Sequence, residues 1–234
     1  MQTVSYSFYT NVKRLKDPKY EPVHIQYSDD LSGYGYNLEK DTNQIILYFG
    51  GSRYIAYNSV GYFGGVFDMP FLSADHYGSQ NSKGRISLKS MKQTAEDLYD
   101  WSIQQYPGRK ITVMGHSYGT GIATYLASVR DCDNLIIMSG YRDLSDLYNK
   151  FIPVFWGPTK LFITENIHLS KYAQNVQCDT YVIGSKADIT LGAQLQQKIH
   201  EQIEGSELKI FEAVHHIDYL NDPEVIDYIN EIMK

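Results

Sequence analysis

Apolar residues along the chain gather in short runs separated by turn signals. Several runs are almost wholly apolar, such as Ile45–Phe49 and Leu135–Met138. Strands of this kind are usually covered on both faces, as in a parallel sheet. The predicted strands are Val23–Tyr27, Gln44–Phe49, Phe71–Ala74, Lys110–Met114, Asn134–Met138, Thr180–Ile183 and Leu208–Phe211.

Helical stripes lie between these runs, with apolar residues three or four positions apart. Such stripes occur within 88–102, 191–203 and 225–232, and Asp222 and Pro223 are a typical cap and first residue for the last helix. The alternation predicts an α/β fold with a mostly parallel sheet and helices on both faces. Up to about Leu38 no helix is expected, and strand-like pieces joined by Asp29-Asp30 and Gly33–Gly35 predict antiparallel strands at one edge.

Length and charge narrow the class of protein. The chain has 234 residues, 43% of them hydrophobic, which suits one domain spanning 1–234. The net charge of −6 argues against a nucleic-acid partner, because phosphate binding requires clustered Lys and Arg. The short basic cluster Lys13–Lys16 is interpreted as a solvated loop.

The sequence shows no pattern of a membrane span or a signal peptide, and it contains only two cysteines. No apolar run approaches the ~20 residues of a membrane span, and Met1–Ser7 lacks the basic and apolar parts of a signal peptide. We therefore expect a cytoplasmic protein. Cys132 and Cys178 are too few for a secreted disulfide scaffold and are expected to be buried free thiols. Nothing in the sequence indicates the oligomeric state.

The most informative segment is Ile111–Ala127, an apolar strand followed by Gly-x-Ser-x-Gly and a helix rich in small residues. A nucleophile on a tight strand-to-helix turn needs small residues two positions before and after it, and here these are Gly115 and Gly119. The pattern predicts Ser117 as a nucleophile, with the N–H of Tyr118 directed at a developing oxyanion. The string alone is a weak signal, but its strand and helix context favours this interpretation over a structural turn.

A serine hydroxyl requires a base, and the base requires a carboxylate, which in this architecture follow in the order Ser, acid, His. Asp188 lies just past a predicted strand and is the preferred acid, although it also suits a helix cap; Asp143 is the second candidate. His215 and His216 follow the last strand, and the residues alone do not choose between them. The other five histidines are interpreted as structural or solvated, with His116 pointing away from the site: His24, His76, His116, His168 and His200.

From about Glu21 onward the chain resembles the α/β-hydrolase superfamily, and it looks most similar to the cap-poor, Bem46-like serine hydrolases. The matching segments are 22–36, 45–52, 75–84 and the tail His216–Pro223. Relatives commonly have His-Gly-Asn where this chain has Gly50-Gly51-Ser52, and Gly at the place of His215. The resemblance implies His216 as the base, seven residues before Pro223, and the N–H groups of Ser52 and Tyr118 as oxyanion donors.

The predicted activity is hydrolysis of a carboxylic ester or acyl thioester of a small molecule through an acyl-enzyme, with no metal or cofactor. The segment 141–178 leaves room for a small lid. Its apolar stretch 151–158 either roofs an acyl pocket or packs in the core. The proposed pocket residues are Tyr54, Tyr57, Phe155 and Trp156, and the same pocket is expected to include further aromatic residues after the oxyanion loop: Tyr62, Phe63 and Phe67. A non-catalytic binding protein and an acyltransferase on the same scaffold are the alternatives.

Overall fold

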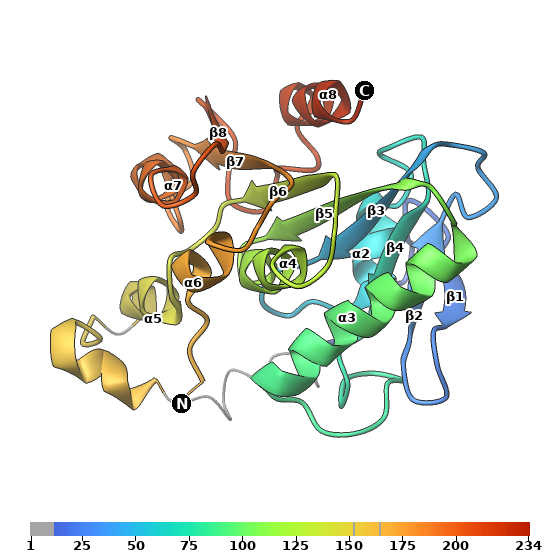
Figure 1. Cartoon of the computed structure of the whole chain (residues 1–234), viewed down its shortest axis with the longest axis horizontal. Coiled ribbons are helices and arrows are strands. Elements are labelled where there is room, and N and C mark those ends of the chain that lie inside the picture. The colour runs from blue at the N-terminus through green and yellow to red at the C-terminus, as the bar shows by residue number, and fades with distance from the viewer. Residues whose placement is uncertain (1–11, 152, 164) are drawn as a thin grey trace.

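A computed structural model describes residues 12–151, 153–163 and 165–234 (Figure 1). In these ranges eight strands form one sheet in the order β1-β2-β4-β3-β5-β6-β7-β8. The strands are β1 (Val23–Gln26), β2 (Ser32–Tyr36), β3 (Gln44–Phe49), β4 (Phe71–Ala74), β5 (Lys110–His116), β6 (Asn134–Met138), β7 (Asp179–Ser185) and β8 (Glu207–Phe211). The expectations about the signal peptide and Met1–Ser7 concern residues outside the described ranges.

The sheet is mostly parallel with an antiparallel edge, which confirms the predicted architecture. β1 pairs with β2 and β2 with β4 in antiparallel fashion, whereas β4, β3, β5, β6, β7 and β8 pair in parallel. The expectation that Gly33–Gly35 is a joint between strands is wrong, because it is the middle of β2. A Cβ at Gly33 would overlap the carbonyl oxygen of Ser73, so glycine lets two backbones approach closely there.

Helices connect the parallel strands, and Figure 1 shows α3 and α4 on one side of the sheet and α8 on the other. The helices are α2 (Ala56–Phe63), α3 (Leu88–Gln105), α4 (Gly119–Ala127), α5 (Leu144–Phe151), the 3-10 helix η1 (Gly157–Phe162), α6 (Leu169–Ala173), α7 (Ala193–His200) and α8 (Pro223–Ile232). Asp222 caps α8 as predicted, because its side chain accepts hydrogen bonds from the N–H groups of Glu224 and Val225.

The core lies on the central strands. Every residue of β3 and β6 is buried, as their continuous apolar runs predict. Truncating one of these side chains, as in Leu47→Ala, is expected to cost about 2–5 kcal/mol of stability, since the cavity left behind cannot collapse fully. The rigid centre of the sheet therefore holds the loops that follow its strands.

The segment between β6 and β7 leaves the sheet and carries α5, η1 and α6 (Figure 1). Lys160 forms an ion pair with Asp143 at 2.8 Å, which ties η1 to the start of the segment. Phe155 is buried, whereas Trp156 is 63% exposed. The stretch that was expected to act as one apolar unit is therefore divided between core and surface.

Lys13, Arg14 and Lys16 are all exposed and lie outside helices and strands, which agrees with the expected solvated loop. The guanidinium of Arg14 also lies over the rings of Tyr34 and Tyr57, 5.3 and 5.1 Å from their centroids, a position in which Arg stacks favourably on aromatic faces. One smaller expectation needs correction. The two cysteines are free thiols as expected, but they are half-buried rather than buried.

None of the helices in the described ranges has both the length and the apolar character needed to cross a membrane.

Candidate active site

Ser117 lies on the sharp turn between β5 and α4, in left-handed backbone conformation with φ of +51°. Such a conformation is strained for a residue with a side chain. A Cβ at Gly115 would lie 2.7 Å from the Cα of Thr120, and one at Gly119 would overlap the carbonyl oxygen of Phe49. Neither position can hold a side chain, because a Cβ would overlap backbone atoms. This agrees with the steric reason given above for the Gly-x-Ser-x-Gly pattern.

The structure brings Ser117, His216 and Asp188 into one line of hydrogen bonds. The Oγ of Ser117 lies 3.0 Å from Nε2 of His216, and Nδ1 of His216 lies 3.0 Å from Oδ2 of Asp188. The three residues follow β5, β8 and β7, whose carboxyl ends meet at the same edge of the sheet. With Nδ1–H donated to the carboxylate, Nε2 is free to accept the proton of Ser117.

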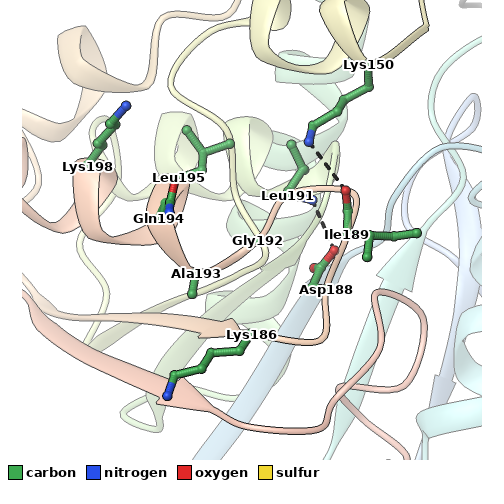
Figure 2. A pocket seen from close by; sticks show the side chains of 10 residues that line it. All are labelled: Lys150, Lys186, Asp188, Ile189, Leu191, Gly192, Ala193, Gln194, Leu195 and Lys198. Carbon is green, nitrogen blue, oxygen red and sulfur yellow. Dashed lines mark hydrogen bonds between the residues drawn. The ribbon is translucent and has the colours of Figure 1, made fainter.

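The other carboxylate oxygen of Asp188, Oδ1, stabilises the loop that follows this residue. Oδ1 accepts hydrogen bonds from the N–H groups of Thr190 at 2.8 Å and Leu191 at 3.0 Å. Figure 2 shows the Leu191 contact and, beside it, the ammonium group of Lys150 directed at the carbonyl oxygen of Ile189. Asp188 thus both caps the following turn and faces His216, so the two interpretations of this residue are compatible.

Three groups contact Oδ2 of Asp188: His216, the hydroxyl of Ser139 at 2.5 Å and the hydroxyl of Tyr219 at 3.2 Å. Burial opposes ionisation of this carboxyl, but the hydrogen bonds from His216 and Ser139 outweigh burial and hold its pKa below the ordinary range. The same neighbourhood raises the pKa of Tyr219, chiefly through burial and then through the Asp188 charge. Asp188 is therefore an anion, and Tyr219 remains a neutral donor.

Ser139 is a site residue that the sequence analysis missed. It follows β6, is fully buried, and has φ of +50°. Its Oγ lies 3.0 Å from Nδ1 of His216 as well as 2.5 Å from Asp188. The available signal was positional: Ser139 follows its strand as Ser117 follows the neighbouring strand, and a glycine comes next.

His116 does not point away from the site as expected. Its Nε2 lies 2.7 Å from the carbonyl oxygen of His216, and the two rings are 5.1 Å apart between centroids. Burial, reinforced by the nearby His216, lowers the pKa of His116 to about 4. The neutral ring must carry its proton on Nε2 to donate to that carbonyl, so His116 supports the backbone of His216.

The alternative candidates lie elsewhere. The carboxylate of Asp143 accepts from the ammonium group of Lys160 and from the N–H of Ser145, and these bonds lower its pKa despite burial. His215 is exposed on the surface. The geometry therefore favours Asp188 and His216 over both.

A cavity of about 450 Å³ opens beside Ser117 and His216. Of the residues expected to line a pocket, Tyr54, Tyr62 and Phe63 line this cavity, whereas Tyr57, Phe67, Phe155 and Trp156 do not. Ser52 lines it as well. Further lining residues that were not expected are Gly51, Arg53, Ile217 and Asn221.

The loop after β3, which begins at Gly50, packs against Tyr54. A Cβ at Gly50 would lie 2.4 Å from a ring carbon of Tyr54, so a larger residue does not fit at this position. Gly51 lies against Ser117, where a Cβ would stand 3.1 Å from the Cβ of the serine. Ser52 follows on the cavity wall, and Tyr118 stands at the N-terminus of α4. Ser52 therefore lines the same cavity as Ser117, and Tyr118 follows Ser117 directly in the chain.

In the described ranges no group of three His, Cys, Asp or Glu side chains is arranged to hold a metal ion.

Comparison with known proteins agrees with this architecture. Residues 67–159 match the family model described as alpha/beta hydrolase fold. A zebrafish (Danio rerio) protein named lysophosphatidylserine lipase ABHD12 is 24% identical over 144 residues, which are 54% of this chain and 37% of that protein. The chain thus spans little more than a third of this curated relative.

Solved structures are similar over nearly the whole chain. The Pyrococcus furiosus esterase Pf2001 superposes with a TM-score of 0.71 at 17% identity, covering 96% of this chain and 94% of that one. Est1E from Butyrivibrio proteoclasticus, in a structure with ferulic acid bound, gives 0.66 at 15% identity and covers 90% and 97%. These likenesses establish the α/β-hydrolase fold. The chain therefore has the α/β-hydrolase fold and is similar to members of that superfamily.

Proposed function

We propose that this chain is a serine hydrolase that cleaves esters through an acyl-enzyme. The observation that carries the proposal is the unbroken line from Ser117 through His216 to Asp188, with both contacts at 3.0 Å. A serine held in strained backbone at a cavity wall, with its hydroxyl facing an imidazole nitrogen, is the arrangement that nucleophilic catalysis requires. The similarity to proteins titled esterase and lipase supports the same reaction class.

In the proposed reaction, Nε2 of His216 removes the proton of Ser117 as its Oγ attacks the substrate carbonyl carbon. The N–H groups of Ser52 and Tyr118 stabilise the oxyanion, aided by the N-terminus of α4. His216 then protonates the departing alcohol oxygen and the C–O bond breaks. A water molecule, deprotonated by His216, releases the acid and restores Ser117. Asp188 stabilises the imidazolium at each stage.

We propose Ser139 as a positioning residue in this reaction. Its hydroxyl donates to Asp188 and lies beside Nδ1 of His216, so it fixes the angle between carboxylate and imidazole. A hydroxyl that donates to an anion contributes more than a neutral hydrogen bond. Tyr219 has a similar but weaker position, because its hydroxyl is 3.2 Å from the same oxygen.

The cavity favours an amphiphilic ester. Tyr54, Tyr62, Phe63 and Ile217 supply an apolar wall of a size that accepts a short acyl or aromatic acid. Arg53 is exposed at the rim of this cavity, in left-handed backbone with φ of +66°. Its guanidinium suits a substrate with a carboxylate or phosphate outside the ester group. An acyl thioester would fit the same chemistry.

The proposal is tested by hydrolysis of p-nitrophenyl esters and acyl thioesters of increasing chain length. We expect ester turnover that disappears in Ser117→Ala, with the highest kcat/KM at short or aromatic acyl groups. Arg53→Gln is expected to raise KM for an ester bearing a negative charge and to leave a neutral ester unchanged. A competing alcohol separates hydrolysis from acyl transfer, since a transferase would form a new ester as its main product.

Absence of turnover in a folded protein that still binds acyl compounds would reject hydrolysis in favour of a binding protein.

A further inference from the structure

The two cysteines lie against each other at the end of the sheet opposite to Ser117. Cys132 precedes β6 and Cys178 precedes β7, and these strands are parallel neighbours in which Asn134 pairs with Asp179. Both cysteines therefore enter the sheet side by side. Ser117, Ser139 and the Asp188 loop follow the other ends of strands in the same sheet, so the thiols are remote from the proposed catalytic groups.

The sulfur atoms are closer than ordinary packing allows. Sγ of Cys132 and Sγ of Cys178 are 2.7 Å apart, although both are free thiols. Non-bonded heavy atoms normally rest at about 3.5 Å or more, and a disulfide bond would bring the sulfurs to about 2.05 Å. Only a small movement of the two side chains would therefore bring the sulfur atoms to disulfide-bond distance.

The backbone around the pair is anchored on both sides. Asp133 exchanges two hydrogen bonds with the main chain of Ile111, at 2.9 and 2.7 Å. Next to Cys178, the hydroxyl of Thr180 donates to the cysteine carbonyl at 3.1 Å. The sheet register and these bonds hold the thiols in place, so their proximity is a property of the fold rather than of mobile side chains.

We propose that Cys132 and Cys178 form a redox modification site, a dithiol that a low-molecular-weight disulfide such as oxidised glutathione converts to an intramolecular disulfide. A cavity of about 600 Å³ gives access to both thiols. Polar side chains line it, including Arg130, Gln174, Asn175 and Gln177. This lining suits a charged, peptide-like oxidant better than an apolar one.

The exchange proceeds in two displacements. The hydrogen bond with Cys132 lowers the pKa of Cys178, and the same bond, with burial, raises the pKa of Cys132. Cys178 therefore attacks first as the thiolate. It breaks the glutathione disulfide, forms a mixed disulfide and releases one glutathione. Cys132 then attacks Sγ of Cys178 and releases the second. Two protein thiols are oxidised, one disulfide is reduced, and the two protons end on the released thiols.

The bond would close a loop between residues 46 positions apart, which contains β6, α5, η1 and α6. Restricting the unfolded chain over a loop of this length is expected to raise Tm by on the order of 10 °C. Under oxidising conditions the disulfide would thus stabilise the segment between β6 and β7.

The test uses the full chain equilibrated with either reduced or oxidised glutathione, then alkylated and weighed intact, with Tm measured in parallel. We expect two alkylated thiols in the reduced protein, and none in the oxidised monomer, which is lighter by two hydrogens and melts on the order of 10 °C higher. Cys132→Ser and Cys178→Ser are matched controls, and each should bind one glutathione without that gain in Tm.

A parent protein that keeps both thiols, carries two glutathiones or forms only disulfide-linked dimers would overturn the proposal. Oxidised and reduced proteins with the same Tm would overturn the stabilising role of the bond. The readouts require no ester hydrolysis, so they stand apart from the proposed function.

Discussion

Two serines at the ends of neighbouring strands make an instructive comparison. Ser117 follows β5 and Ser139 follows β6, both in left-handed backbone at φ of +51° and +50°. Each hydroxyl lies 3.0 Å from a nitrogen of the same imidazole, Ser117 from Nε2 and Ser139 from Nδ1 of His216. Local conformation and distance to the base are therefore nearly identical.

What differs is the surroundings of each hydroxyl. Ser117 opens onto the cavity and is followed at once by α4, whose N-terminus favours negative charge. Ser139 is fully buried and donates to the Asp188 carboxylate. A nucleophile requires substrate access and a basic nitrogen, and only Ser117 has both. The comparison teaches that strained backbone at a strand end does not by itself specify a role; Asn37, which follows β2 with φ of +56°, has the same conformation outside the site.

The largest expected effect concerns Ser117 itself. Ser117→Ala should lower kcat for ester hydrolysis by a factor on the order of 10⁴–10⁶, because the acyl-enzyme can no longer form. Steady-state kinetics on a p-nitrophenyl ester measure this loss. Unchanged Tm in the variant separates lost chemistry from lost folding. Retention of more than a tenth of the parent rate would remove Ser117 from the nucleophile role.

The base gives the next largest effect, and the adjacent histidine is its control. His216→Ala should lower kcat by about 10⁴-fold, because proton transfer and imidazolium stabilisation are both lost. The exposed His215→Ala should remain within a few-fold of the parent. The same kinetic assay compares the two variants directly, and the reverse ranking would move the base to His215.

A smaller effect is expected for Ser139. Ser139→Ala should lower kcat about tenfold to hundredfold with little change in KM, because it removes a hydrogen bond to an anion that orients the base. Ser139→Gly also removes the hydroxyl but relieves the left-handed backbone. Equal losses in both variants would identify the hydroxyl as the cause, and normal activity in Ser139→Gly would attribute the effect to backbone strain. The pH profile of kcat should shift in both variants.

The last effect concerns stability rather than catalysis, and it arises from His116. Its pKa falls from 6.5 to about 4 on folding, so the unfolded chain binds the proton first as pH drops. Stability is therefore complete above pH 6.5 and is lost as pH falls toward 4, by at most about 3.4 kcal/mol from this group. Denaturant unfolding at several pH values measures the slope.

His116→Gln should reduce that slope by about 1.4 kcal/mol per pH unit between these limits. His24→Gln, at an exposed position, is the matched substitution. Identical slopes for the parent and His116→Gln would contradict the burial of a neutral imidazole at this position.

The sequence was informative where burial is continuous and where a motif has a steric cause. The runs in β3 and β6 are apolar throughout because both faces are covered, and their positions were predicted to the residue. Gly115 and Gly119 were predicted to be positions that must be small, and the structure shows that a Cβ at either one would meet backbone atoms. These constraints act within a few residues or repeat along a strand, so they produce a pattern that can be recognised in the amino-acid sequence.

Other features depend on contacts between distant segments. Ser139 lies 49 positions from Asp188, and no short motif records that their side chains meet. His116 contacts the main chain of His216 across 100 positions, which the elbow motif does not reveal. Phe155 and Trp156 do not line the cavity beside Ser117. The path of the segment between β6 and β7 depends on tertiary pairs such as Lys160 with Asp143, which no local pattern records.

The central claim is that Ser117, and not its counterpart on the next strand, is an activated nucleophile. The most direct measurement is to react the protein with a fluorophosphonate and locate the adduct by peptide mass spectrometry, with Ser117→Ala and Ser139→Ala treated in parallel. The account predicts one adduct on Ser117, absent from Ser117→Ala and slower to form in Ser139→Ala. An adduct on Ser139, or a folded parent that does not react, would contradict it.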